Sequence, residues 1–377
     1  MSKYFDVCIR GDGVVGRTLA LLLAQQRLRV ALVAAPAAPT PEGQAPVDVR
    51  AYALNKASRE LLQGLRAWPD STGAAAAVTP VQQMRVWGDD GGQLDFTAAD
   101  AGHESLAWIV DVPALEHRLA EAVRYAPQIE TLDAPAKAAL TVVCEGKKSS
   151  SRAEFGVHWT SKPYAQKAIA ARLASDLPHR GIARQWFSGG AVLALLPLGG
   201  NGGNSVALVW SVSMERAAQL EQLTDDDFCR ELQLACKEET SEETSALRLI
   251  SPRSSWPLSL ATADHWVGPR WALAGDAAHT VHPLAGQGLN LGLADVASLA
   301  GVLAGREYWR ELGDERLLRR YERARKADVA AMGAVTDGLH GLFAQPDSRW
   351  QALRNWGMKG FARSGFLKNW VARQAAG

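Results

Sequence analysis

The apolar positions at the amino terminus predict a strand, a helix and a second strand in succession. Residues 4–9 form a short apolar run typical of a buried strand, residues 14–26 form an apolar helix, and residues 29–33 form another apolar run. Three glycines stand at the turn between the first strand and the helix. The pattern therefore predicts a βαβ unit of about 30 residues with a glycine-rich first turn.

The three glycines have the spacing G-x-G-x-x-G, which is typical of dinucleotide-binding turns when a strand precedes and a helix follows. Gly11 permits the tight turn, Gly13 lets a pyrophosphate approach the backbone, and Gly16 lets the helix pack on the strand. N–H groups at the helix start would bind the phosphates. We therefore expect a dinucleotide site at Gly11, Gly13, Val14, Val15 and Gly16. The alternative is a glycine-rich turn of another α/β protein.

The acidic residue that usually ends the second strand of such a unit is missing. That residue accepts hydrogen bonds from the adenosine ribose, and hydrogen bonds to a charged group contribute about 1.5–3 kcal/mol each. Here Val33 is followed by Ala34. We expect this loss to weaken a nucleotide site without abolishing it.

A second informative stretch covers residues 271–290. An apolar strand leads into Gly275 and Asp276, a turn rich in Gly and Pro follows, and a helix begins near Gly288. Asp276, at the end of a strand, can accept hydrogen bonds from sugar hydroxyls. The start of a helix in this place favours partial negative charge on a ligand.

This second stretch resembles the second FAD fingerprint of the FAD-dependent aromatic-ring hydroxylases. The segment Asp48–Leu54 resembles an Arg-containing segment of the same family. Two further segments, in the same order along the chain, resemble its ubiquinone-biosynthesis members: Tyr164–Ala168 and Ala194–Leu198. The resemblance covers residues 4 to about 330 and is far more specific than the glycine turn alone.

The resemblance implies FAD as the cofactor, with Asp276 at the ribityl chain and the turn 283–290 against the isoalloxazine ring. It implies catalytic positions at Pro283, Gly286, Gln287 and Gly288. Besides the glycine turn, it implies cofactor contacts for Arg50, Glu145, Gly275, Asp276, Leu284, Ala285, Gly286, Gly288, Leu289 and Asn290. We expect no metal site, because no cluster of carboxylates accompanies His279 and His282.

Two further departures from the family pattern concern the same cofactor. Glu145 stands where the family carries the Asp of an Ala-Asp-Gly segment, although Ser149 and Arg152 keep their places. The segment 126–139 is short and offers at most one strand, where the family usually has several. With Ala34, these departures favour an alternative in which FAD is lost.

The sequence predicts an α/β protein with a p-hydroxybenzoate hydroxylase-like fold, in which a β-rich substrate domain is inserted into a Rossmann-like FAD-binding domain. The FAD-binding domain is expected at 1–74, 107–152 and 265–330, the substrate domain at 75–106 and 153–264, and a C-terminal helical region at 331–377. Within the substrate domain we expect strands at 184–188, 191–196 and 205–212 and a helix at 225–239.

Composition excludes few classes of protein. The chain has 377 residues, of which 47% are hydrophobic and 21% charged, and a formal net charge of +1. This balance can build a large core, and no basic stripe interleaved with aromatics indicates nucleic-acid binding. Four cysteines without a C-x-x-C pair fit a reducing cytoplasm, and the amino terminus lacks a signal-peptide layout. We expect a cytoplasmic protein.

From Leu339 onward the chain mixes Trp and Phe with Arg and Lys. A basic helix rich in Trp and Phe can lie on an anionic membrane surface. One hypothesis is therefore a peripheral contact with the inner membrane or a quinone-biosynthesis complex through this region. The alternative is a helix that packs on the core with a basic outer face.

The resemblance implies a monooxygenase in which NADH or NADPH reduces FAD and the reduced flavin activates O₂ to hydroxylate a phenolic ring, here a polyprenylphenol of ubiquinone biosynthesis. The alternative hypothesis is an FAD-deficient, non-catalytic accessory subunit of a quinone-biosynthesis complex. A third hypothesis is a flavin hydroxylase that acts on an unrelated soluble aromatic compound.

Overall fold

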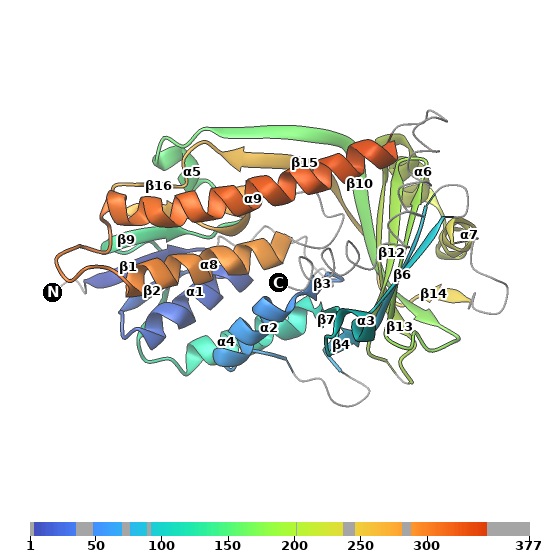
Figure 1. Cartoon of the computed structure of the whole chain (residues 1–377), viewed down its shortest axis with the longest axis horizontal. Helices are drawn as coiled ribbons and strands as arrows, with labels where there is room; N and C mark the ends of the chain where they lie inside the picture. Colours follow the sequence, from blue (N-terminus) through green and yellow to red (C-terminus); the bar gives the residue numbers. More distant parts are fainter. Residues whose placement is uncertain are drawn as a thin grey trace.

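The computed structural model describes residues 4–34, 48–69, 76–88, 92–200, 202–236, 246–280 and 288–344, with side chains up to residue 331. Figure 1 shows an elongated molecule with a sheet and its helices at one end and a larger sheet at the other. The long helix α9 (Glu315–Ala344) extends from the first end toward the second.

The amino-terminal βαβ unit forms the centre of a six-stranded sheet. Its strands in spatial order are β16 (Val267–Gly268), β17 (Trp271–Leu273), β9 (Ala138–Val143), β1 (Phe5–Arg10), β2 (Val30–Val33) and β8 (Ile129–Leu132). All neighbours pair in parallel except β16 and β17. Both faces of such a sheet must be covered, which explains why β1 and β2 are almost continuously apolar.

Four helices pack together beside this sheet. The helix α1 (Val14–Gln25) contacts both α4 (Val112–Arg124) and α8 (Gly288–Ala304), and α8 contacts α9. Their apolar side chains join those of the strands in one core, which includes Leu19, Leu115 and Leu299. The predicted helix at 14–26 and the predicted helix start at Gly288 are confirmed.

A nine-stranded sheet forms the other end of the molecule. Its main path is β18 (His279–Thr280), β15 (Ser254–Ala263), β10 (Trp159–Ser175), β13 (Ser205–Ser213), β12 (Ala191–Leu198), β11 (Ile182–Ser188), β5 (Gln83–Trp87) and β6 (Gln93–Thr97), and β14 (Leu247–Leu249) pairs with β10. The three strands predicted here, at 184–188, 191–196 and 205–212, are confirmed.

Each face of the nine-stranded sheet is covered differently. The helices α6 (Met214–Gln222) and α7 (Asp225–Ala235) pack on it through a core that contains Trp210 and Phe228. On the other side, β12 contacts a three-stranded sheet of β3 (Ala51–Leu54), β7 (Ala107–Asp111) and β4 (Val78–Val81). The short helices α2 (Lys56–Gly64), α3 (Ala98–Ala101) and α5 (Ser151–Glu154) complete the described secondary structure outside the turn at 275–277.

The strand pairing bears on the predicted domains. Strands β5 and β6 join the large sheet, whereas β4, placed in the substrate domain by sequence, pairs with β7 from the predicted FAD-binding domain. The single strand expected within 126–139 is β8. The division into domains stays a prediction, and residues 345–377 of the predicted C-terminal region lie outside the described residues.

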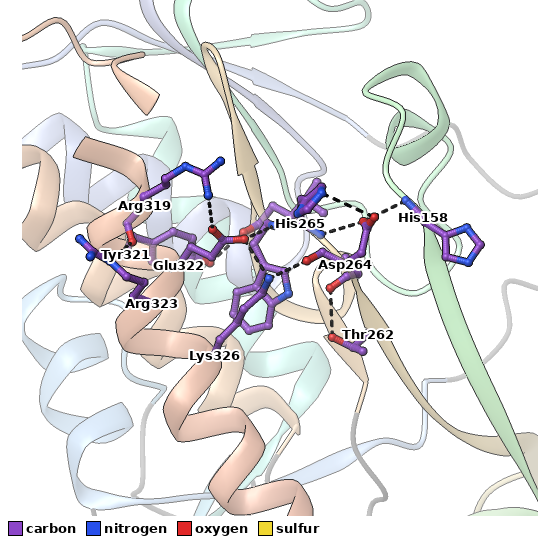
Figure 2. Close-up of polar contacts among 12 residues, drawn as sticks. His158, Thr262, Asp264, His265, Arg319, Tyr321, Glu322, Arg323 and Lys326 are labelled. Atoms are coloured by element: carbon purple, nitrogen blue, oxygen red, sulfur yellow. Dashed lines mark hydrogen bonds and ion pairs between the residues drawn. The ribbon is translucent and has the colours of Figure 1, made fainter. Parts of the chain in front are cut away.

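Helix α9 is tied by polar contacts to the segment before β17. The carboxylate of Glu322 accepts a hydrogen bond from the backbone N–H of Trp266, and the ammonium of Lys326 donates to the carbonyl oxygen of Asp264 (Figure 2). The buried hydroxyl of Tyr321 donates to the carbonyl oxygen of Leu273 over 2.7 Å. In the part of the chain that the structure describes, α9 included, no helix combines the length and apolarity needed to span a bilayer.

Candidate active site

The glycine turn has the geometry that its spacing predicted. Gly11 has φ +106°, and a Cβ there would lie 2.5 Å from the carbonyl oxygen of Cys144. A Cβ on Gly16 would lie 1.9 Å from the carbonyl oxygen of Gly11. A Cβ on Gly13, by contrast, would meet no atom within 4 Å. Gly11 and Gly16 are thus required by packing, whereas Gly13 keeps a space open at the start of α1.

That space belongs to a cavity of about 430 Å³, called here the glycine-turn cavity. It lies where β1, β9 and β17 end, as ligand sites in open parallel sheets do. Its wall includes Gly13, Val14, Val15, Asp276, Gly288 and Leu289. The structure therefore brings together the two sequence stretches, more than 200 residues apart, from which a cofactor site was predicted.

The carboxylate of Asp276 is free to bind a ligand in this cavity. Its side chain is open to the cavity, and it accepts no hydrogen bond from the described residues. Desolvation by the surrounding walls raises the pKa of Asp276, although the nearby His279 and Lys147 act in the opposite direction. Hydroxyl groups of a ligand would restore the hydrogen bonds that this carboxylate lacks.

The turn that carries Asp276 is held from beneath by Asp295 on α8. The carboxylate oxygen Oδ2 of Asp295 accepts the backbone N–H of Gly275 over 2.9 Å and lies 2.6 Å from Nε2 of His279. Its Oδ1 accepts a hydrogen bond from Nε of Arg325 on α9. His279 also stacks on Trp266, so both ends of the turn are fixed.

Two hydroxyl groups in the wall of the glycine-turn cavity have no hydrogen-bond partner among the residues that the structure describes. They are Oγ of Ser259 on β15 and Oγ1 of Thr280 on β18. An unsatisfied buried hydroxyl costs about 1–3 kcal/mol, which a polar ligand would relieve. The open space at Gly13, the free carboxylate of Asp276 and these hydroxyls together fit a dinucleotide that carries phosphates, sugar hydroxyls and a polar ring edge.

Arg50 lies in the wall of the same cavity, as predicted for it. Its guanidinium is held by two carboxylates, with Nη2 at 2.6 Å from Asp48 and 3.4 Å from Glu116. The hydrogen bond to Asp48 raises the pKa of Arg50 above its already high value. The neighbouring Tyr52 lines the cavity as well, and desolvation raises the pKa of its hydroxyl.

Glu145 and Asn290 make other contacts and do not line the cavity. The carboxylate of Glu145 accepts hydrogen bonds from the hydroxyls of Ser149 and Ser151, both over 2.6 Å. Asn290 donates to the carbonyl oxygen of Ala53 and accepts from the backbone of Asn55, which ties α8 to β3. The predicted cofactor contacts of Glu145 and Asn290 stay predictions.

Of the other residues predicted to contact the cofactor, Gly275 is described by the structure, and those of the turn after Thr280 are not. Gly275 has φ +64° and lies under the turn, where a Cβ would approach Val15 to 3.3 Å. Pro283, Leu284, Ala285, Gly286 and Gln287, together with His282, lie outside the described residues. In the described ranges, no three His, Cys, Asp or Glu side chains gather in a group that could hold a metal ion.

A second, apolar pocket of about 130 Å³ lies between β3 and the large sheet. Its wall includes Met84, Val192, Ala194, Leu196, Ala207 and Val209. Three residues belong to the walls of both cavities, namely Arg50, Tyr52 and Trp256, and they are called here the junction. Sequence reasoning did not assign this pocket, although the alternating small and branched residues of β12 and β13 point to one face.

The chain matches the model of the family described as FAD binding domain over residues 128–336, more than half of its length. The ubiquinone hydroxylase UbiL of Rhodospirillum rubrum is 31% identical over 409 residues, covering 100% of this chain and 90% of that protein. The 3-demethoxyubiquinol 3-hydroxylase of Escherichia coli is 30% identical over 399 residues, covering 99% and 98%.

The chain belongs to the FAD-dependent aromatic-ring hydroxylases. Two solved structures have the same fold. PqsL of Pseudomonas aeruginosa, a probable FAD-dependent monooxygenase, superposes with a TM-score of 0.74 at 20% identity, covering 95% of this chain and 100% of that one. The p-nitrophenol 4-monooxygenase PnpA of Pseudomonas putida gives 0.75 at 16% identity, covering 100% and 99%.

Membership of this hydroxylase family confirms the predicted resemblance, the p-hydroxybenzoate hydroxylase-like fold and FAD as the cofactor. It also suggests which ligand each of the two cavities would bind. The glycine-turn cavity, which contains residues from both predicted cofactor stretches, is the candidate place for FAD. The apolar pocket shares the junction with it, so a compound in the pocket would lie directly beside the cofactor site.

Proposed function

We propose that this chain is an FAD-dependent monooxygenase that hydroxylates the phenolic ring of a polyprenylphenol in ubiquinone biosynthesis, with NADH or NADPH and O₂ as co-substrates. The observation that carries the proposal is the shared wall of the two cavities, since hydroxylation requires an apolar aromatic compound beside the flavin site. The relatives from Rhodospirillum rubrum and Escherichia coli, named as ubiquinone-pathway hydroxylases, support the substrate class.

The residues of the glycine-turn cavity would hold FAD in a definite order. The start of α1, at Gly13 to Val15, suits the pyrophosphate, because backbone N–H groups at a helix start favour anions. Asp276 suits the ribityl hydroxyls, and the hydroxyls of Ser259 and Thr280 suit polar atoms of the cofactor. When bound and reduced by NADH or NADPH, FAD would supply the two electrons that activate O₂, a redox chemistry that the protein's own side chains lack.

The apolar pocket would position the ring and exclude water. Its small and branched side chains on β12 and β13 offer no charge to a bound ring, and an apolar wall favours a hydrocarbon substituent by about 25 cal/mol per Å² of buried surface. Exclusion of water also protects a reactive oxygen species from wasteful side reactions. These properties suit a prenylated phenol better than a charged aromatic compound.

The alternative hypothesis, a non-catalytic accessory subunit without FAD, rests on Ala34, Glu145 and the short 126–139 segment. It is not favoured, because relatives that cover nearly the whole chain are named as hydroxylases. The open space at Gly13 and the free carboxylate of Asp276 are also features of a site that still accepts a ligand.

The first test is a titration of the purified protein with FAD, followed by an assay with NADH or NADPH. We expect visible flavin absorption with saturable binding, and oxidation of the nicotinamide that depends on an added phenol. Mass spectrometry should find one added oxygen atom in a prenylated phenol and less product from the unprenylated analogue. A colourless protein that takes up no FAD at any concentration would contradict the proposal.

The contact with a membrane surface or a quinone-biosynthesis complex is part of the same proposal. It is supported by the basic and aromatic residues from Leu339 onward, and by the water-insoluble tail of the proposed substrate. Sedimentation with anionic vesicles, compared between the full chain and a chain ending at residue 344, tests it. Equal binding of both chains would remove the carboxyl-terminal segment from the proposal.

A further inference from the structure

The position of the missing acidic residue, Ala34, lies beside the glycine turn. The backbone N–H of Gly11 donates to the carbonyl oxygen of Val33 over 2.9 Å, so the end of β2 is fixed against the turn that would hold the pyrophosphate. In nucleotide sites of this type, the acid at the end of β2 accepts hydrogen bonds from the adenosine ribose. Ala34 has no side-chain oxygen with which to do so. A ribose bound here needs an acceptor from another element.

Strand β8 brings an aspartate to the same edge of the sheet. β2 and β8 are parallel, with Val33 opposite Leu132, and the N–H of Ala34 donates to the carbonyl oxygen of Leu132 over 3.2 Å. The next residue along the chain is Asp133, which therefore follows opposite Ala34 at the carboxyl end of the sheet. Neighbouring strands are about 4.8 Å apart, so Asp133 lies about one strand spacing from the usual position of the acid.

Asp133 also belongs to the appropriate face of the sheet. Val33 and Leu132 pack together on one face, whereas Leu32 packs with Leu19 of α1 on the other. Because successive side chains of a strand point to opposite faces, the residues after Val33 and Leu132 turn toward the face that carries α1. The pyrophosphate would bind at the start of α1, so Asp133 lies on the side of the sheet where the adenosine would continue.

The carboxylate of Asp133 is unoccupied, in contrast to other acids near the turn. It is exposed, and it has no hydrogen bond or ion pair with the residues that the structure describes. Asp12, inside the glycine turn, accepts a hydrogen bond from Arg17 over 3.1 Å, and Glu116 lies 3.4 Å from Arg50. Asp133 can therefore accept hydrogen bonds from a ligand without losing a contact of its own.

We propose that the carboxylate of Asp133 accepts hydrogen bonds from the ribose hydroxyls of the adenosine half of FAD and replaces the acid that is absent at Ala34. A hydrogen bond to a charged acceptor is stronger than one to a neutral acceptor, so a carboxylate from the neighbouring strand can offset the loss at β2. The inference rests on FAD as the cofactor and does not depend on which substrate is hydroxylated.

The test is a titration with FAD of the wild type, of Asp133→Ala and of a matched control, Asp226→Ala, which removes another exposed aspartate, on α7. We expect Asp133→Ala to raise the Kd for FAD about tenfold or more, as loss of hydrogen bonds to a charged group does, and Asp226→Ala to leave it unchanged. The same proteins are titrated with FMN, which lacks the adenosine, and its Kd should be equal in all three. Urea unfolding of FAD-free Asp133→Ala should match the wild type, because the carboxylate has no contact to lose.

A rescue by Ala34→Asp distinguishes a contact with the ribose from a merely structural role of Asp133. In the Asp133→Ala background this change restores an acid at the end of β2, and it should return the Kd for FAD to within about threefold of the wild type. Wild-type FAD affinity in Asp133→Ala, or an equal loss of affinity for FMN, would overturn the inference. Failure of Ala34→Asp to restore FAD binding would overturn it too, because the contact of Asp133 would then not be with the ribose.

Failure of the proposed function would look different. A wild type that binds FAD but hydroxylates no phenol would contradict the proposed reaction, and the titrations would still decide the role of Asp133. A wild type that takes up no FAD would contradict the inference about Asp133 as well.

Discussion

Asp295 is fully buried on α8, and its carboxylate oxygen Oδ2 lies 2.6 Å from Nε2 of His279 on the opposite side of the cofactor turn. The same oxygen accepts the backbone N–H of Gly275, which begins that turn. The carboxylate therefore connects the two ends of the segment that carries Asp276. Through its ion pair with Arg325, the carboxylate also connects this segment to α9. No single stretch of sequence indicates that connection.

Replacing this carboxylate should destabilise the protein. Asp295→Asn keeps the shape but leaves the buried guanidinium of Arg325 without its buried partner, and breaking a buried ion pair costs about 3–5 kcal/mol. We expect the free energy of unfolding in urea to fall by that amount, with weaker FAD binding. The control is Asp328→Asn, which removes a 64% exposed partner of the same Arg325 and should cost less than about 1 kcal/mol. Equal effects of the two changes would show that burial does not matter here.

Two glycines of the same turn should respond in opposite ways to alanine. Gly13→Ala adds a Cβ where no atom lies within 4 Å, so unfolding should change by less than about 1 kcal/mol, while the Kd for FAD rises about tenfold or more. Gly16→Ala places a Cβ 1.9 Å from the carbonyl oxygen of Gly11 and should cost about 3 kcal/mol or more. Thermal unfolding and FAD titration separate the two effects. Normal FAD binding by Gly13→Ala would place the phosphates elsewhere.

The hydroxyls of Ser259 and Thr280 should affect the FAD-free protein and the FAD-bound protein in opposite ways. Ser259→Ala and Thr280→Val remove groups that are unsatisfied in the FAD-free protein, so its stability should be unchanged or slightly higher. With FAD, each change should weaken binding by about 1 kcal/mol, or roughly fivefold. Ser161→Ala, at an exposed position of β10, serves as the control. Unchanged FAD affinity in both variants would mean that these hydroxyls do not contact the cofactor.

Glu145 gives a prediction about pH. Burial by itself raises the pKa of Glu145, but the hydrogen bonds from Ser149 and Ser151 and the nearby charge of Arg10 together hold it below its ordinary value of 4.5. A carboxylate of this kind contributes stability above pH 4.5, and the contribution is lost as the pH falls through its lowered pKa. The stability difference between the wild type and Glu145→Gln should therefore be largest near pH 7 and shrink below pH 4.5. A difference that stays constant across this range in urea unfolding would contradict the prediction.

The sequence by itself determined the local parts of the fold and of the site. The apolar runs of β1, α1 and β2 and the spacing of Gly11, Gly13 and Gly16 predicted the turn, because strand and helix periodicity and the need for glycine are properties of neighbouring residues. The stretch through Gly275 and Asp276 was recognisable for the same reason. These patterns were sufficient for the fold class and the cofactor.

Only the tertiary structure decided which distant residues meet. It placed Asp276 opposite Gly13, joined the apolar pocket to the cofactor cavity at Tyr52, and turned Glu145 toward Ser149 and Ser151. The ion pair of Asp295 and Arg325 joins residues 30 positions apart on two helices. Such contacts depend on how sheets and helices pack and on which polar groups remain to be paired after packing, and local sequence patterns do not carry that information.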